Sequence, residues 1–354
     1  MTDSASVRSE LLAPLGWDRA LEEAFTAEAG VAGRPARVSR VDRRLCTVLE
    51  PLPLRAESLH HPVATGDWVV IQPGPSPSDR QRVSALLPRR TAFVRDRSGP
   101  ETAAQVLAAN VDRVFVICGL DVDLNGPRLE RYLTLAWQSG ATPVVLLTKA
   151  DLCSEAVTTS AIGWAGGIAP GVDVRAISPA TGTGIEELAA VHLGEGRTAA
   201  MLGPSGVGKS SLVNALAGKQ VMTTAATRRD GKGRHTTTHG QLLLVPGRGV
   251  LLDTPGLRGL GLWNAAEGLS QAFDDIELLA SACRFSDCAH SSEPGCEVRQ
   301  ALAEGRLTDE RYRSWRKLQR ELTSLAARQG DLKVRQEAQR RWKALSREAR
   351  RHPR

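Results

Sequence analysis

A glycine-rich octapeptide carries the clearest chemistry in this sequence. Residues 203–210 read Gly-Pro-Ser-Gly-Val-Gly-Lys-Ser, which fits the phosphate-binding pattern G-x4-G-K-[ST]. The apolar stretch 198–202 precedes the loop and a helical pattern over 209–216 follows it, so the loop is expected between a strand and a helix. In that context, backbone N–H groups and the helix N-terminus can contact phosphate oxygens.

The residues of this loop have different predicted roles. Lys209 is expected to reach the β and γ phosphates, and the hydroxyl of Ser210 is expected to bind Mg²⁺. The predicted phosphate contacts are Gly203, Pro204, Ser205, Gly206, Val207, Gly208, Lys209, Ser210 and Ser211. Mg²⁺ is therefore an expected cofactor of this site.

Two segments after the loop can complete the phosphate site. Asp253 ends the apolar strand 250–252, where a carboxylate can hold Mg²⁺ through water, and the amide of Gly256 can donate to the γ phosphate. Residues 228–238 lie between these pieces and are rich in Gly, Arg and Thr. GTPases usually take their second protein ligand to Mg²⁺ from such a segment. Thr236, Thr237 and Thr238 are the alternatives, and Thr237 is the preferred one.

A second motif predicts which base is bound. Thr148-Lys149-Ala150-Asp151 follows an apolar strand and fits [NT]-K-x-D, whose Asp accepts two hydrogen bonds from guanine while the Lys stem lies along the base plane. Ser178 and Pro179 open a further base-side element after the next strand. GTP and GDP are therefore the expected ligands. The alternatives are an ATP-dependent enzyme with the same phosphate loop and an RNA-binding scaffold that does not hydrolyse nucleotide.

The order of these motifs is unusual, because the base-reading residues precede the phosphate loop. Ordinary Ras-like GTPases place them after it. Apolar strands alternate with amphipathic helices from residue 112 to 253, which predicts an α/β domain whose parallel strands carry ligands at their carboxyl ends. A circular permutation would bring the pieces together, since domain termini often lie close to each other.

A cluster of potential metal ligands follows the predicted nucleotide site. Cys283, Cys288, His290 and Cys296 lie within fourteen residues. Three thiols and one imidazole can surround one tetrahedral structural Zn²⁺, and in a cytoplasmic chain metal binding is expected before disulfides. The predicted helices 307–327 and 332–349 come next, so the C-terminal part is expected to be a zinc-binding α-helical domain.

The net charge of +7 is unevenly distributed along the chain. It divides into −4 for residues 1–30, +6 for 31–97, −5 for 98–305 and +10 for 306–354. Short apolar stretches between turn residues predict a small β-barrel in the first basic part. Clustered Lys and Arg gain affinity by displacing counterions from phosphates, so RNA is the expected partner of both basic parts.

Two features of the sequence predict a cytoplasmic protein. A run of about 18 apolar residues, as a membrane span needs, does not occur, and residues 1–30 do not read as a secretory signal. A cytoplasmic monomer that does not enter membranes is expected. Residues 1–32 are predicted to be a flexible leader, in which 17–25 can form one short helix.

Taken together, the motifs closely resemble the circularly permuted bacterial GTPases of the RsgA (YjeQ) family, which act in late maturation of the small ribosomal subunit. The resemblance is carried by residues 131–151, 203–211, 233–238 and 253–256 and by the four Cys and His residues. It implies an OB-fold at 33–97, a permuted GTPase domain at 98–265 and a zinc-stapled helical domain at 266–354. It also implies contacts of all three with ribosomal RNA and GTP hydrolysis stimulated by the small subunit.

Two positions depart from the usual motifs. Thr148 stands where many members have Asn, which puts in question the side-chain tie between the base site and the phosphate loop. Leu257 stands where Ras-like proteins have the Gln that orients water. The resemblance suggests His235 for that catalytic role, and the alternative is a His that only contacts phosphate or solvent.

Overall fold

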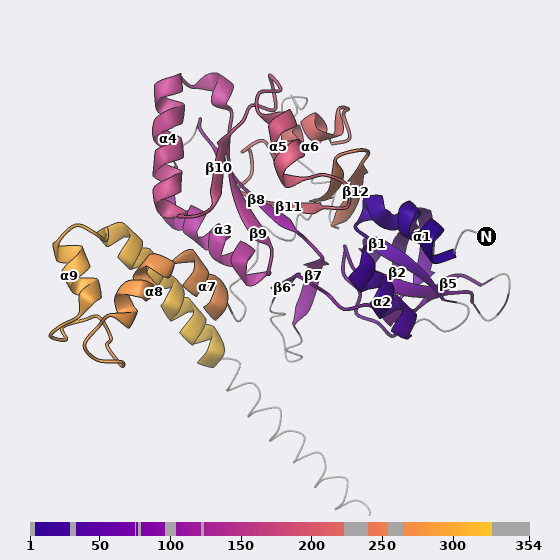
Figure 1. The fold of residues 1–354 in the computed structure, drawn as a ribbon, viewed down its shortest axis with the longest axis horizontal. Coiled ribbons are helices and arrows are strands. Elements are labelled where there is room, and N and C mark those ends of the chain that lie inside the picture. Colours follow the sequence, from indigo (N-terminus) through magenta and orange to yellow (C-terminus); the bar gives the residue numbers. More distant parts are fainter. Residues whose placement is uncertain are drawn as a thin grey trace, which may run out of the picture. The chain divides into compact units, whose positions relative to one another are not determined.

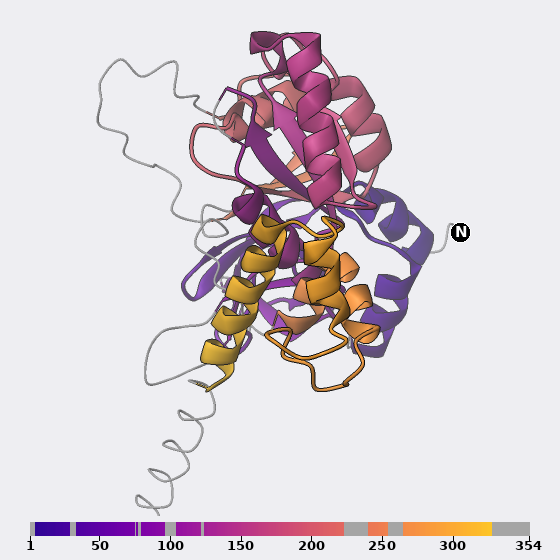
Figure 2. The same ribbon diagram turned by 90° about the vertical axis from the view of Figure 1, so that its left-hand side faces the viewer.

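A computed structural model describes most of the chain (Figures 1 and 2). The described residues are 4–28, 33–74, 76, 79–95, 104–121, 124–222, 240–253 and 265–327. Two compact units divide the chain, one formed by Met1–Val94 with Val106–Leu260 and the other by Arg95–Gln105 with Gly261–Arg354. Each unit is considered on its own below.

Five strands near the N-terminus close into a barrel. They pair in the order β1-β2-β3-β5-β4, and β4 returns to pair with β1. The interior contains small and β-branched apolar side chains, among them Val38, Val48, Val69 and Ile71. This is the five-stranded barrel expected of an OB-fold. The strands are β1 (Arg34–Asp42), β2 (Leu45–Glu50), β3 (Leu52–Glu57), β4 (Trp68–Gln72) and β5 (Gln81–Leu86).

The segment before the barrel is helical, in contrast to the predicted flexible leader, and the short helix considered for residues 17–25 is confirmed. It forms α1 (Ser4–Leu12), η1 (Ala13–Leu15) and α2 (Arg19–Glu28). Trp17 packs edge-on against Trp68 with 4.9 Å between ring centroids, in a buried cluster with Leu21 and Phe25. Because side chains alternate along β4, Trp68 and Val70 face these helices, while Val69 and Ile71 face the barrel interior. The correction has a simple cause: the apolar partner of the leader lies about fifty residues away along the chain.

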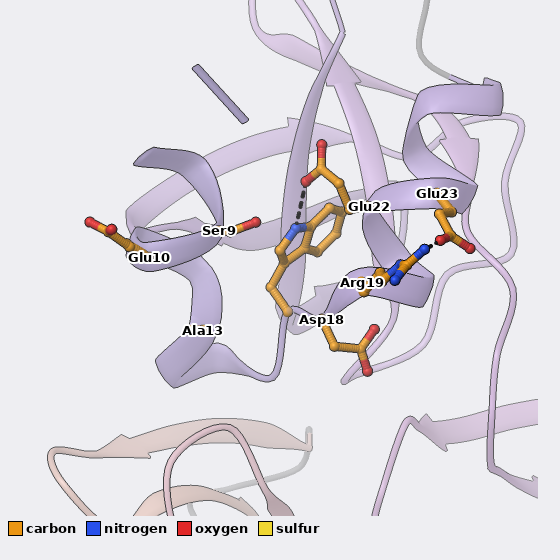
Figure 3. A pocket seen from close by; sticks show the side chains of 8 residues that line it. Ser9, Glu10, Ala13, Asp18, Arg19, Glu22 and Glu23 are labelled. Atoms are coloured by element: carbon orange, nitrogen blue, oxygen red, sulfur yellow. Dashed lines mark hydrogen bonds and ion pairs between the residues drawn. The ribbon is translucent and has the colours of Figure 1, made fainter. Parts of the chain in front are cut away.

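An open pocket lies between α1 and the start of α2 (Figure 3). Trp17 Nε1 donates to Glu22 Oε2 at 2.8 Å within it. Arg19 and Glu23 form an ion pair at 2.9 Å along the same helix. These contacts hold the polar side of α2 while its apolar side covers the barrel.

The second part of this unit is the predicted α/β domain. Its strands continue the barrel sheet in the order β10-β9-β8-β11-β13-β12-β1. The five strands β10, β9, β8, β11 and β13 are mutually parallel, and β12 is antiparallel to β13. These strands are β8 (Arg113–Gly119), β9 (Thr142–Thr148), β10 (Asp173–Ala176), β11 (Thr198–Leu202), β12 (Gln241–Val245) and β13 (Gly249–Asp253). The phosphate-loop strand β11 therefore lies between β8 and β13, at the centre of this part of the sheet.

Helices cover both faces of this sheet, α3 and α4 on one side and α5 and α6 on the other (Figure 1). They are α3 (Gly126–Gln138), α4 (Glu155–Ile168), α5 (Ile185–His192) and α6 (Lys209–Ala217). The expected strands 198–202 and 250–252 and the expected helix 209–216 are confirmed, whereas α4 was not predicted. A short two-stranded sheet, β6 (Ala92–Arg95) with β7 (Gln105–Ala109), follows the barrel.

The second unit is helical around the Cys and His residues. It contains α7 (Ala266–Ala272), α8 (Asp274–Ser281) and α9 (Glu297–Ala303), followed by helical residues 309–327. The predicted helix 332–349 lies outside the described residues. Within the described part of the chain, none of the helices has both the length and the apolar character that crossing a membrane requires.

Candidate nucleotide and zinc sites

The phosphate loop owes its shape to the absence of side chains. Gly203 has φ +157°, and a Cβ at this position would lie 2.6 Å from the carbonyl oxygen of Ile117 in the neighbouring strand β8. Gly206 and Gly208 also have positive φ values, 85° and 94°. Val207 is buried in the core of the domain and anchors the loop between them. The backbone N–H groups are thereby turned into the concave side that phosphate oxygens require.

The loop ends in the helix that the motif predicts. Gly208 is the N-cap of α6, and its carbonyl accepts the first helical hydrogen bond from Leu212 N–H at 2.9 Å. The N–H groups of the first turn, which include Ser210, are therefore directed toward the loop. Lys209 Nζ donates to the carbonyl of Gly203 at 2.8 Å and to that of Pro204. The ammonium group thus lies within the loop, where it can bind phosphate oxygens.

The predicted base-reading residues are joined to this loop by a hydrogen bond. Thr148, at the end of β9 and fully buried, donates from Oγ1 to the carbonyl of Val207 at 2.6 Å, and Oγ1 lies 3.2 Å from the carbonyl oxygen of Cys118. The departure from Asn therefore does not remove the tie, since a hydroxyl makes the contact instead. The strand pairing explains the geometry, because β8 and β9 end side by side.

Asp151 lies just beyond this tie with its carboxylate held in place. Ser178 Oγ donates to Asp151 Oδ1 at 2.5 Å and accepts from Thr181 N–H at 3.2 Å. Ser178 is buried, whereas Asp151 is exposed. The segment beginning at Ser178 and Pro179 thus orients the predicted base acceptor, while the carboxylate remains accessible to a guanine edge.

One partner in this region was not found by the sequence analysis. Lys149 has φ +64° and pairs through Nζ with the carboxylate of Asp121, which follows β8. The only signal in the sequence is the position of Asp121 directly after an apolar strand, where ligand-binding side chains of α/β sheets are usually found.

The remaining predicted nucleotide contacts are only partly described. Asp253 ends β13, the parallel neighbour of the phosphate-loop strand, and is half-buried. His235, Thr237 and Gly256 lie outside the described residues. The described half of the site consists of the phosphate loop, the base-reading residues and Asp253, all at the carboxyl ends of adjacent strands.

The second site brings together the four predicted zinc ligands. One ligand atom from each of Cys283, Cys288, His290 and Cys296 lies within 4.8 Å of every other. Cys283 Sγ lies 3.9 Å from Cys296 Sγ and 3.6 Å from His290 Nδ1, and Cys296 Sγ lies 3.4 Å from the same nitrogen. A tetrahedral Zn²⁺ would separate two sulfurs by about 3.8 Å and sulfur from nitrogen by about 3.5 Å. The donor set and its spacing fit this ion.

Backbone and carboxylate contacts organise the loop that carries these ligands. Glu293 accepts backbone N–H bonds from Ser291 at 2.8 Å, Ser292 at 3.0 Å and Ala289 at 3.2 Å. Its own backbone N–H and these three lower the pKa of its carboxyl to about 2. Gly295 has φ +75°, and a Cβ there would lie 3.0 Å from Arg284 Cβ. Glu293 and Gly295 thus hold the turn that leads from His290 back to Cys296.

Further contacts support the imidazole and one thiol. Tyr312 donates from its hydroxyl to the carbonyl of His290 at 3.0 Å, and the rings of His290 and Trp315 lie 5.7 Å apart. Burial raises the pKa of the Cys283 thiol, but the N–H groups of Val298 and Glu297 at the start of α9 outweigh it and leave the pKa below its usual value. Thiolate is the form that binds zinc.

Comparison with known proteins agrees with this geometry. The sequence profile of the RsgA GTPase family matches residues 86–263. A protein of Streptomyces avermitilis named small ribosomal subunit biogenesis GTPase RsgA is 49% identical over 350 residues, which cover 96% of this chain and 93% of the relative. The chain belongs to the RsgA GTPase family. A protein of the same name from Streptomyces coelicolor is 47% identical over 94% of this chain and 92% of its own.

Solved structures of RsgA-like proteins have the same fold. The structure of YjeQ from Thermotoga maritima matches with a TM-score of 0.61 and 26% identity, and covers 82% of this chain and 99% of that one. The structure of YloQ, a circularly permuted GTPase, has a TM-score of 0.60 at 21% identity and shows a common fold. The permuted order of motifs in this RsgA-family chain is thus a property of the fold.

Proposed function

We propose that this chain is a GTP hydrolase that assists late maturation of the small ribosomal subunit and is stimulated by that subunit. The observation that carries the proposal is the hydrogen bond from Thr148 to Val207. It joins a guanine-reading motif to a phosphate loop that lies more than fifty residues further along the chain. Family membership and the names of the two Streptomyces relatives support the biological role.

The proposed hydrolysis depends on positioning and on neutralisation of charge. Asp151 accepts hydrogen bonds from guanine, while Lys209 and the loop amides stabilise the γ phosphate. Mg²⁺ would be held by Ser210 and Thr237, with Asp253 acting through water, and would neutralise charge that develops on the phosphates. His235 orients the attacking water when the small subunit is bound.

We further propose that the barrel and the basic C-terminal part bind ribosomal RNA in the cytoplasm. The charges of +6 over residues 31–97 and +10 over 306–354 support a polyanionic partner. The zinc site has a structural role, because all four ligands are protein side chains and no coordination position is left for a substrate.

GTP turnover with and without purified small subunits tests this proposal. Stimulation by subunits is expected for the wild-type protein, and Asp151→Asn should exchange the preference for guanine with one for xanthine nucleotides. Equal turnover in both conditions would contradict activation by the subunit. Binding without turnover, even on subunits, would favour the scaffold, and ATP preference would favour the other enzyme class.

A further inference from the structure

The barrel and the α/β domain share one row of paired residues. Arg40 of β1 pairs with Gln241 of β12, and Gln241 pairs in turn with Asp253 of β13. Both pairings are antiparallel and belong to a single sheet, in which β12 lies beside β1 (Figure 1). The barrel is therefore two strands away from Asp253, the carboxylate proposed to act on Mg²⁺.

A barrel side chain reinforces this row from the side. Thr65 is 3% exposed, and its Oγ1 donates to the carbonyl of Gly240 at 3.4 Å, directly before Gln241. The carbonyl of Thr65 also accepts from Ala109 N–H at 2.9 Å. This one barrel residue therefore contacts two segments of the α/β part, the start of β12 and the end of β7.

The loop that carries Thr65 is itself fixed in place. Gly66 has φ +92°, and a Cβ there would lie only 2.2 Å from the carbonyl oxygen of Ala109. The carbonyl of Gly66 accepts from Asn110 Nδ2 at 3.1 Å and from Arg37 Nε at 3.4 Å. Because this loop is fixed, it cannot move together with the strand that follows Gly240. A movement of that strand would break the Thr65 hydrogen bond, so the bond favours one position of the strand.

We propose that Thr65 is a positioning residue for the Mg²⁺ side of the nucleotide site, acting through Gly240, Gln241 and Asp253. The inference rests on the proposed function, since it assumes that Asp253 serves Mg²⁺. The base side has separate supports in the Thr148 and Ser178 hydrogen bonds, on strands at the other side of the phosphate loop. Weakening the Thr65 contact should therefore lower the affinity for Mg²⁺ and leave recognition of guanine unchanged.

The test is a Mg²⁺ titration of the full chain bound to a fluorescent, non-hydrolysable GTP analogue. In Thr65→Val, which loses only the hydroxyl donor, the half-saturating Mg²⁺ concentration should rise about threefold, as for the loss of one long hydrogen bond. Affinity for the analogue in EDTA should not change. Thr65→Ser should restore the wild-type titration, because it keeps the hydroxyl. Ser84→Ala is the matched control, since its Oγ donates to the barrel carbonyl of Val70 at 3.2 Å, away from this row.

Each outcome decides between the hypotheses. An unchanged Mg²⁺ titration in Thr65→Val overturns the positioning role and leaves the proposed function intact, whereas a wild-type chain that binds no guanine nucleotide overturns the proposed function itself. Equal losses with Mg²⁺ and in EDTA would show a merely structural role. Asn110→Gly provides a second variant if Thr65→Val does not fold. It allows the native φ of +55° but removes the side-chain hydrogen bonds to the carbonyl of Gly66 and from Arg90 N–H. The same selective loss of Mg²⁺ affinity is expected, and an unchanged Mg²⁺ affinity would contradict the inference.

Discussion

The zinc cluster and the phosphate loop are built in opposite ways. The cluster depends on four particular side chains, whose ligand atoms meet within 4.8 Å. The loop depends on positions without side chains, such as Gly203, where a Cβ would lie 2.6 Å from a carbonyl oxygen. The cluster should therefore lose its metal when a ligand is replaced, and the loop should lose affinity for GTP when a methyl group is added. The two sites lie in different compact units, so each failure should stay local.

The largest effect is expected for the loss of a zinc ligand. Structural zinc contributes on the order of 10 kcal/mol to the folding of small domains, so Cys296→Ser should lose stoichiometric zinc and unfold the helical unit. Binding of GTP by the other unit should persist. Metal analysis and nucleotide titration on the same preparation measure both, and Cys153→Ser provides a control outside the cluster. Loss of GTP binding together with zinc would contradict the separation of the sites.

A methyl group in the phosphate loop should have the reverse selectivity. Gly203→Ala forces either the loop or β8 to move, at a cost of about 3 kcal/mol, so GTP affinity should fall about a hundredfold while zinc content stays normal. Gly206→Ala is the matched control, because a Cβ there meets nothing within 4 Å. Only the backbone strain of a positive φ remains in that variant, and about a tenfold loss is expected. Equal losses in the two variants would exclude the close contact as the cause.

A smaller effect is expected where a carboxylate organises the zinc loop without binding the metal. Glu293→Gln should weaken zinc binding about tenfold, because outer contacts of this kind orient the ligands. Competition with a chromogenic chelator measures the affinity. Asp287→Asn, at an exposed position between two of the Cys ligands, should have no such effect. A normal zinc affinity in Glu293→Gln would show that the four ligands alone determine the loop.

The smallest change concerns the hydroxyl that replaces the usual amide. Thr148→Val removes one hydrogen bond, worth about 1 kcal/mol, and should lower GDP affinity about fivefold. Thr148→Asn should bind at least as well as the wild type, since Asn can make the same tie. Isothermal titration with GDP is the measurement, and Thr142→Val at the opposite, exposed end of β9 is the control. An unaffected Thr148→Val would mean that strand pairing alone joins the two halves.

Short sequence patterns predicted the parts of the fold that depend on residues close together in the chain. The strand and helix around the phosphate loop, the buried parallel strands and the clustering of four Cys and His side chains were predicted, because each depends on short spacings or continuous apolar runs. Helix α4 was missed because its Gly, Thr and Ser residues give weak helical periodicity. It begins with a cap in which Ser154 accepts from Val157 N–H, and buries Ala161 and Ala165. These contacts compensate for low intrinsic helix propensity.

Contacts between distant segments could not be predicted in the same way. The hydroxyl of Thr148 bonds to Val207, and Asp121 pairs with Lys149, only because β8, β9 and β11 end side by side. The leader helices depend likewise on Trp68. In each case the side chain was visible in the sequence, but its partner was determined by the arrangement of the sheet.

The buried guanidinium of Arg37 has a consequence for how this chain can be divided. It is 1% exposed and donates to carbonyls of Leu15, Gly66 and Asn110, which belong to the leader, the barrel and the α/β part. Cutting the chain at residue 33 or 97 would leave a buried cation with missing acceptors, which is strongly destabilising. These three parts should therefore melt in one cooperative transition, and an expression fragment that begins with the barrel or ends with it should be prone to aggregation.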